Sequence, residues 1–273
     1  MAESLPSDVS RYAASVEYDG ADYHGWQRQR ASISVQQVVE AALSNIANEP
    51  VSVFCAGRTD SGVHASSQIV HFDSRASRSD VQWLRGVNTQ LPDDVSIPWV
   101  SPVSGHFHAR FSALSRRYRY IIYNRKVSPG ILRRAVTWHR SYLDADSMHI
   151  AVQSLLGEHD FSSFRASGCN AHTPFRCIQA ARVVRIDDYV VLDITANAFL
   201  QHMVRNIVGL LLKIGSNEWS VSSMKEILEM RDRRQSAPTA SPCGLYLVAV
   251  EYPQTFNLPE TLLGPAFIGS LLP

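Results

Sequence analysis

The stretch of sequence best suited to chemistry is the run AGRTDSGVHA at residues 56–65. Gly57 and Gly62 allow backbone angles that other residues resist, so the run can form a sharp, exposed turn that carries Arg58 and Asp60. A carboxylate held in this way can attack an electron-poor carbon. Asp-Ser-Gly is also an ordinary turn sequence in which the carboxylate bonds its own backbone, and the local sequence by itself favours that interpretation.

Arginines fall in short groups beside aromatic residues. Of the 26 basic residues, 23 are arginine and three are lysine, a bias toward the planar, bidentate cation that suits phosphates and stacked bases. A compositional bias of the lineage would explain the same numbers. Basic groups interleaved with aromatic rings are typical of surfaces that bind single-stranded RNA. The groups are Arg28 and Arg30 near Trp26, Arg116, Arg117 and Arg119 around Tyr118 and Tyr120, and Arg133 and Arg134 near Trp138.

Composition narrows the classes of protein that fit. The net charge is only +1, so overall charge does not by itself argue for nucleic acid. The longest apolar runs are far too short to span a bilayer and no signal-peptide pattern is present, so we expect a cytoplasmic protein. The four cysteines are scattered, which favours reduced thiols. His106 and His108 alternate without a third ligand at a suitable spacing, so we expect no metal site.

Hydrophobic periodicity predicts the strands and helices that would position these residues. Residues 11–18 alternate like a strand, and residues 34–47 carry a helical apolar stripe behind a capping serine. Together the segments predict an α+β protein made of two similar halves. Further strands are predicted at residues 51–55, 67–72, 117–123, 181–186, 190–195 and 245–252, and further helices at residues 81–91, 144–156, 199–213 and 221–231.

The pattern of elements begins again at residue 107. We therefore expect an N-terminal half at residues 8–106, which carries the Asp60 turn, and a C-terminal half at residues 107–253. Because no linker marks the junction, the halves are expected to share a continuous sheet, and a cleft between them is the default place for an active site. Residues 254–273 form an apolar tail that packs either on the body or on a partner subunit.

Four motifs taken together resemble the TruA family of tRNA pseudouridine synthases. They are the run at residues 56–65, YDGADYHGWQRQ at 18–29, FHARFSALSRRYRY at 107–120 and FLQHMVRNIVG at 199–209. Shorter matching pieces at residues 34–36, 88–95, 159–164 and 244–252 extend the resemblance from Tyr18 to Tyr252. Several motifs in the same order carry far more weight than any one of them. Ser61 stands where the family more often has alanine, which leaves Asp60 untouched.

The resemblance implies both a fold and a reaction. The implied fold is that of pseudouridine synthases, with two RRM-like α+β halves that share a mainly antiparallel sheet, helices on one side and a central cleft. The implied function is a homodimeric enzyme that isomerises uridines 38, 39 and 40 in the anticodon stem-loop of tRNA, with no cofactor, metal or membrane. The reaction breaks the bond from C1′ to N1 and remakes it to C5. Because the charge of the expelled uracil spreads over its ring, a second carboxylic acid is not required.

The matching motifs also imply which residues are catalytic. Asp60 is the expected nucleophile, attacking either C1′ of the ribose or C6 of the base. Arg205 is the expected ion-pair partner that keeps this carboxylate charged, although a helix-surface arginine is the structural alternative. Arg58 is expected to fill the space of an extruded nucleotide or to bind phosphate, and its structural alternative is a salt bridge.

Other residues are expected to bind the substrate. Tyr118 would stack on the uracil with its hydroxyl near the proton that leaves C5, whereas an ordinary core aromatic is the alternative. Leu245 would form an apolar wall against the base, although core packing would explain it equally well. His202, Arg116 and Arg28 are expected to contact the RNA.

Two other functions compete with this interpretation. A non-catalytic RNA-binding module of similar fold would need no aspartate in the turn, so the intact Arg58-Thr59-Asp60 triplet disfavours it. A hydrolase that used Asp60 on a nucleoside would need a second placed carboxylate, which the motifs do not offer.

Overall fold

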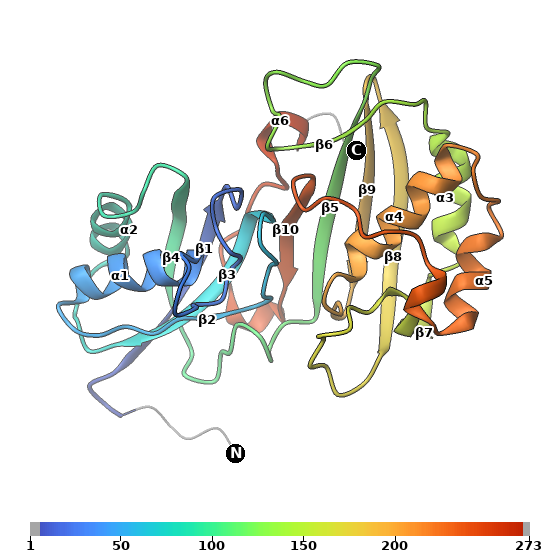
Figure 1. Ribbon diagram of the computed structural model, residues 1–273. Helices are drawn as coiled ribbons and strands as arrows, with labels where there is room; N and C mark the ends of the chain where they lie inside the picture. The colour runs from blue at the N-terminus through green and yellow to red at the C-terminus, as the bar shows by residue number, and fades with distance from the viewer. Residues whose placement is uncertain (1–5, 270–273) are drawn as a thin grey trace. The chain divides into compact units, whose positions relative to one another are not determined.

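The computed structural model describes residues 6–269 of the chain, which divides into two compact units. The first unit comprises Met1–Leu114 together with Leu247–Pro273, and the second comprises Ser115–Tyr246. Each unit contains mainly antiparallel strands and several helices (Figure 1), so the predicted α+β class is confirmed.

In the first unit, the three long strands lie side by side in the order β4, β1, β3, and β1 pairs antiparallel with both neighbours. The short β2 pairs antiparallel with β3, and β10 is the other neighbour of β3. Helices α1 and α2 cover one face of these strands (Figure 1). The bounds are β1 Ser10–Tyr18, α1 Val35–Ala47, β2 Phe54–Cys55, β3 His64–Ser74, α2 Asp80–Asn88, β4 Val95–Val103 and β10 Leu245–Glu251.

Two local features stabilise the helices on this face of the first unit: an N-cap on α1 and a cluster of aromatic rings under α2. The hydroxyl of Ser34 accepts a hydrogen bond from the Gln37 amide, which gives α1 its N-cap as the sequence predicts. Trp83 of α2 is fully buried, with its ring centroid 5.5 Å from that of Tyr12 and 5.2 Å from that of Phe72. These contacts fix α2 against β1 and β3.

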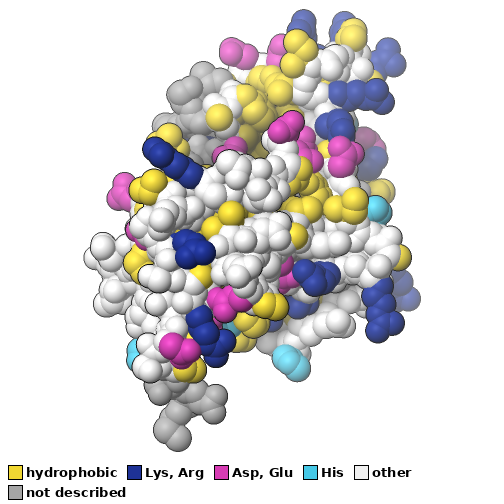
Figure 2. All heavy atoms as spheres, turned by 90° about the vertical axis from the view of Figure 1, so that its left-hand side faces the viewer, with side chains coloured by type: hydrophobic (Ala, Val, Ile, Leu, Met, Phe, Trp, Pro, Cys, Tyr) yellow, Lys and Arg dark blue, Asp and Glu magenta, His cyan; other side chains and the backbone are white. Residues whose placement is uncertain are grey.

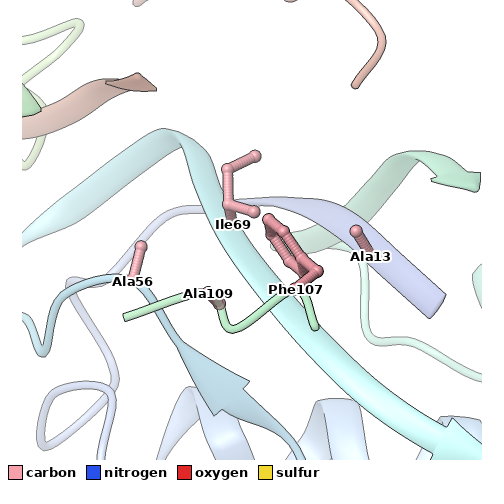
Figure 3. Packing of buried hydrophobic residues seen from close by; sticks show 5 residues of the cluster. All are labelled: Ala13, Ala56, Ile69, Phe107 and Ala109. Atoms are coloured by element: carbon pink, nitrogen blue, oxygen red, sulfur yellow. The ribbon is translucent and has the colours of Figure 1, made fainter. Parts of the chain in front are cut away.

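The opposite face of the same strands is covered by chain from two distant segments. Figure 3 shows the Phe107 ring beside Ile69 and Ala13, in a buried cluster that also contains Ala56 and Ala109. Tyr252 packs against this cluster, and so do Phe256 and Leu258 of the C-terminal tail. Farther along, the tail hydroxyl of Thr261 lies 3.1 Å from that of Ser67, and Ile268 of the short helix α6, Ala266–Gly269, is fully buried. The tail therefore packs on its own chain, which the sequence leaves open.

In the second unit, four antiparallel strands lie in the order β5, β9, β8, β7, and the short β6 runs parallel to β5. Helices α3, α4 and α5 accompany these strands (Figure 1). The bounds are β5 Ser115–Asn124, β6 Thr137–His139, α3 Ala145–Gln153, β7 Gly157–Asp160, β8 Phe175–Ile186, β9 Tyr189–Ala196, α4 Met203–Gly215 and α5 Ser223–Met230.

A buried ion cluster joins β5 to β9. Arg117 donates two hydrogen bonds of 2.6 and 2.7 Å to Asp193, and Arg119, whose side chain is 1% exposed, donates a third of 3.0 Å to it. Burial raises the pKa of the Asp193 carboxyl, but the hydrogen bonds and charges of the two arginines outweigh it, so its pKa lies below its usual value. The guanidinium groups of these two arginines therefore have a structural role, because both pair with Asp193.

Candidate active site

The predicted Asp60 turn lies between β2 and β3 of the first unit. The Val63 amide donates to the Asp60 carbonyl oxygen at 3.2 Å, which closes the turn, and Gly62 adopts the positive φ of 76° that its sequence position predicts. At the start of the turn, the side-chain amide of the fully buried Gln68 bonds both the N–H and the carbonyl oxygen of Gly57. The turn is thus tied at its beginning to the strand that follows it.

A second segment, residues 18–26, braces the tip of the turn from the side. The Trp26 amide donates to the Thr59 carbonyl oxygen at 3.1 Å, and the Tyr18 hydroxyl lies 2.8 Å from the Thr59 hydroxyl. The Tyr23 carbonyl oxygen accepts from the Ser61 hydroxyl at 3.2 Å and from the Gly62 amide at 3.3 Å. The residues on both sides of Asp60 are therefore held by neighbours that lie more than thirty positions away.

Gly25 makes this bracing possible. It has a φ of +85°, and a Cβ atom there would lie 2.6 Å from the Thr59 carbonyl oxygen and 3.0 Å from the Asp60 carbonyl carbon. Only a glycine combines that conformation with so close an approach. The two segments thus meet backbone against backbone beside Asp60.

The two predicted functional side chains of the turn differ in their surroundings. Asp60 is half-buried and Arg58 is exposed. Within residues 6–269, Arg58 makes neither a hydrogen bond nor an ion pair, so the salt bridge that would give it a purely structural role is not formed. Its guanidinium remains available to an anionic ligand.

Arg28 lies elsewhere in the first unit and has a partner. Its guanidinium is 2.5 Å from Glu40, whose side chain is 6% exposed and also accepts from the Val53 amide at 3.0 Å. Arg28 thus neutralises a buried carboxylate, although its own side chain is about half exposed. On the face in Figure 2, basic side chains lie scattered among acidic ones, which agrees with the near-zero net charge.

Tyr118 lies on β5 of the second unit and is 8% exposed. Its ring meets that of Phe199 edge-on, with centroids 5.0 Å apart and planes at 83°. Arg116, two residues earlier on the strand, is equally buried and donates to the Asn197 carbonyl oxygen at 2.9 Å. Tyr118 and Arg116 are thus both fixed against the segment that follows β9.

Arg205 projects from the first turn of α4 toward the loop at residues 237–241. Its Nε donates to the Ala240 carbonyl oxygen at 2.9 Å, and the Ala240 amide donates back to the Arg205 carbonyl oxygen at 3.1 Å. The loop can approach because Gly209 has no side chain: a Cβ there would lie 2.0 Å from the Pro238 carbonyl oxygen. The guanidinium is therefore held by the backbone of a neighbouring loop.

The remaining predicted residues also belong to the second unit. His202 is half-buried, has a φ of 61° and directly precedes α4, where its carbonyl oxygen accepts from the Asn206 amide. Leu245 is 5% exposed and begins β10. Arg58 and Asp60 are thus brought together in one turn of the first unit, whereas Tyr118, Arg116, Arg205, His202 and Leu245 belong to the second.

Sequence reasoning missed the residues that hold the turn, above all Tyr18, Gly25 and Gln68. Tyr18 and Gly25 lie inside a quoted motif, but only the fold shows what they contact. Gln68 lies on a predicted strand, where nothing local distinguishes it from a surface glutamine.

The described residues contain neither a cluster of metal ligands nor a membrane-spanning helix. Between residues 6 and 269, no three His, Cys, Asp or Glu side chains gather as ligands of a metal ion. No helix in the same range is long and apolar enough to cross a membrane.

Comparison with known proteins gives matches over almost the whole chain. The sequence model of a family described as tRNA pseudouridine synthase matches residues 14–112 and 151–253. The tRNA pseudouridine synthase A of Shewanella sp. (strain MR-4) is 54% identical over 258 residues, which cover 94% of this chain and 99% of that protein. The tRNA pseudouridine synthase A of Cronobacter sakazakii is 52% identical over 268 residues, 98% of this chain and 99% of that protein.

Among solved structures, the archaeal box H/ACA sRNP Nop10-Cbf5 complex matches with a TM-score of 0.35 and 13% identity, over 74% of this chain and 43% of that chain.

The chain belongs to the tRNA pseudouridine synthase family, whose members isomerise uridine to pseudouridine. The family and the class of enzyme predicted from the sequence motifs are thereby confirmed. The first matched segment contains Arg58 and Asp60, and the second contains Arg205 and Leu245, while Tyr118 lies between the two segments.

Proposed function

We propose that this enzyme converts uridines 38, 39 and 40 of the tRNA anticodon stem-loop to pseudouridine, with Asp60 as the covalent nucleophile. The choice of positions rests on the motifs shared with the TruA family. The choice of nucleophile rests on one structural observation: Asp60 lies at the tip of a turn that is fixed on both sides by hydrogen bonds with residues 18–26. A nucleophile held in this way loses little further freedom when the substrate binds.

The proposed reaction needs no external reagent. In one route the Asp60 carboxylate attacks C1′ and the bond from C1′ to N1 breaks, leaving the electron pair on the uracil. The base then turns so that its C5 attacks C1′ and displaces the carboxylate, after which the C5 proton is lost and N1 gains a proton. In the other route Asp60 first adds to C6 of the base. Both routes end in an isomer of uridine and return Asp60 unchanged.

The other candidate residues have proposed roles in the same reaction. Tyr118 would stack on the detached base and accept or relay the C5 proton, for which its ring is already fixed edge-on against Phe199. Arg205 would favour the charged form of the Asp60 carboxylate. The exposed guanidinium of Arg58 would bind a phosphate or occupy the space that an extruded base leaves.

The RNA contacts proposed for the remaining residues rest on the sequence motifs. His202, Arg116 and Arg28 would contact the RNA, and Leu245 would form the apolar wall against the base. We also propose that the enzyme acts as a homodimer in the cytoplasm, where tRNA is found. Sedimentation of the purified protein tests this, because a monomer at working concentrations contradicts it.

The target positions are tested with unmodified tRNA transcripts that carry a single uridine in the anticodon arm. The protein is incubated with transcripts whose uridine lies at position 38, 39 or 40, and with control transcripts whose uridine lies at 32 or 35. Pseudouridine is then detected by mass-labelling of the isomer. Product confined to positions 38–40 supports the proposal, whereas product at the control positions contradicts it. Release of free uracil would instead identify a hydrolase.

A further inference from the structure

Four aromatic rings form a row across the surface of the first unit. Phe54 of β2 stacks on His71 of β3, with centroids 5.0 Å apart and planes at 17°. His71 is followed by His108 at 4.5 Å and then by Phe111 at 4.4 Å, both on the chain that follows β4. The inner ring of His71 is buried, but the outer rings are open to solvent, because Phe54 is 55% and Phe111 is 75% exposed.

The two imidazoles of the row are held uncharged. Nδ1 of His71 accepts a hydrogen bond from the Ala109 amide at 3.1 Å, and Nδ1 of His108 accepts from the Arg110 and Phe111 amides at 3.1 and 3.3 Å. A ring nitrogen that accepts carries no proton. Burial lowers the pKa of His71 to about 4 and also lowers the pKa of His108, so both rings are neutral near pH 7. The imidazoles of the row therefore carry no charge near pH 7.

The guanidinium groups of Arg110 and Arg58 lie close to the row. Arg110 lies over the Phe111 ring, with its Cζ 5.4 Å from the centroid. Burial raises the pKa of the Cys55 thiol to about 12, and the positive charges of Arg58 and Arg110 both act on this thiol in the opposite direction. Cys55 follows Phe54 in the chain, so both guanidiniums lie within electrostatic reach of one end of the row.

Phe54 also lines a groove that carries positive charge. This groove has a volume of about 550 Å³ and is lined by residues 27–30, by Gln36 and Glu40, and by residues 52–54. Arg30 is exposed there, and within the described part of the chain no carboxylate pairs with it. Arg110 at the Phe111 ring and Arg30 in the groove beside Phe54 together fit a polyanion whose bases can stack.

We propose that Phe54, His71, His108, Arg110 and Phe111, here called the aromatic-basic strip, bind an unpaired segment of the tRNA substrate. Bases of this segment stack on the solvent-exposed rings of Phe54 and Phe111. At Phe111 a base takes the place of the Arg110 guanidinium, which then contacts the phosphates together with Arg58. A base can stack on a side chain only when it has left its own helix, so the segment belongs to a loop. The proposal rests on tRNA being the substrate. The five residues of the strip lie outside those proposed for catalysis, and only Arg58 takes part in both proposals.

The strip positions RNA next to the catalytic turn. Phe54 is the first residue of the two-residue strand β2, and the run that contains Asp60 begins at Ala56, directly after this strand. Bases held on the strip would therefore fix the path of the strand close to the uridine that reacts. We expect the strip to act mainly on substrate affinity, with a smaller effect on the rate of the bound complex.

The test measures binding of unmodified tRNA to variants of the strip. Phe111→Ala and Phe54→Ala are each expected to weaken binding on the order of 10-fold, because base stacking on an aromatic ring is lost. Phe111→Trp should bind within about twofold of the wild type, whereas Phe111→Leu, which keeps an apolar side chain without a ring face, should resemble Phe111→Ala. Because these side chains are exposed, thermal unfolding of all the variants should match that of the wild type.

Tyr142 provides a matched control in the second unit. Its side chain is 72% exposed and is covered by a guanidinium, that of Arg185, with Cζ 4.8 Å from the ring centroid. Tyr142→Ala therefore removes an equally exposed, arginine-covered ring and should leave tRNA affinity unchanged. An equal loss of affinity with Tyr142→Ala would show that the effect is not specific to the strip and would overturn the proposal.

Stacking itself is observed with 2-aminopurine, a fluorescent base that is quenched when it stacks. Placed at successive positions of the anticodon loop, it should be quenched by the wild type at one or more positions and not by Phe111→Leu. Wild-type affinity of Phe111→Leu, or quenching that survives in it, would overturn the proposal. The affinity readout does not depend on which uridine is modified, so an error in the proposed target positions would appear in the pseudouridine map while the affinity losses remain.

Discussion

Replacing Gly25 with alanine should impair catalysis although Gly25 carries no functional group. The new Cβ atom would lie 2.6 Å from the Thr59 carbonyl oxygen, whereas an ordinary contact begins near 3.4 Å. Two backbones must therefore separate by several tenths of an ångström, and the φ of +85° adds strain for any residue other than glycine. We expect Gly25→Ala to lower the free energy of unfolding by about 2–4 kcal/mol.

The shift falls on the backbone that carries the proposed nucleophile. A displacement approaching 1 Å can reduce a rate about 100-fold, so a movement of several tenths of an ångström at Asp60 should reduce kcat about 10- to 100-fold. The binding of tRNA should change much less, because the substitution leaves every exposed side chain in place. The assay is single-turnover pseudouridine formation at saturating enzyme, run beside urea unfolding and a tRNA binding titration.

Two other glycines separate the causes of this effect. Gly157 has a φ of +93° but no backbone within 4 Å of a Cβ position, and Gly130 has neither a positive φ nor any neighbour within 4 Å. Gly157→Ala should therefore lose stability without losing kcat, and Gly130→Ala should change neither. A Gly25→Ala enzyme that kept the wild-type kcat would refute the conclusion that this segment positions the turn.

Three further predictions concern the fold and the braces of the turn. Asp193→Asn should destabilise the protein by about 3–5 kcal/mol in urea unfolding, since it removes the carboxylate that pairs with the buried Arg119; a loss below 1 kcal/mol would contradict this account. The free energy of unfolding should fall by about 2 kcal/mol from pH 7 to pH 5 through His71, because the unfolded chain binds a proton at the ordinary pKa near 6.5 while the folded site does so only at about 4. His71→Gln should remove that part of the pH dependence, and an unchanged slope would show that another group causes it. Tyr18→Phe should lower stability by about 1 kcal/mol through the lost bond to Thr59 and should reduce kcat more than it weakens tRNA binding, which single-turnover kinetics can distinguish.

The sequence predicted most elements, because their signals are local. The apolar stripe and capping serine of residues 34–47 correspond to α1 with its N-cap at Ser34, and the alternating residues 11–18 lie in β1. The predicted strand at residues 51–55 is only Phe54–Cys55, and the predicted helix at 199–213 begins at Met203, after a residue with positive φ. Boundaries of this kind are set by neighbours in space and are the least visible in sequence.

Strand β4 was not predicted. It contains Pro98 and Pro102, which ordinarily argue against a strand. In the structure β4 lies at the edge of the first unit's strands, with β1 as its one neighbour there, and an edge strand tolerates prolines whose missing N–H groups need no partner.

In the candidate site, too, the residues with local sequence signals were predictable, and those that depend on long-range contacts were not. The turn that carries Asp60 was visible from its glycines, and the family motifs pointed to Arg205 and Tyr118. The braces from Tyr18, Gly25 and Gln68 were not visible, because each depends on a backbone contact with a segment distant in the chain. The same holds for Arg28, whose pairing with Glu40 depends on how α1 packs.

The central claim, that Asp60 is the nucleophile, is tested most directly by single-turnover pseudouridine formation in unmodified tRNA with the wild type and with Asp60→Asn. Asp187→Asn, at an exposed aspartate in the turn between β8 and β9, serves as the matched control. We predict that Asp60→Asn loses at least about 10⁴-fold in rate while it still binds tRNA and that Asp187→Asn behaves as the wild type. Pseudouridine formed by Asp60→Asn at a rate close to that of the wild type would contradict the assignment.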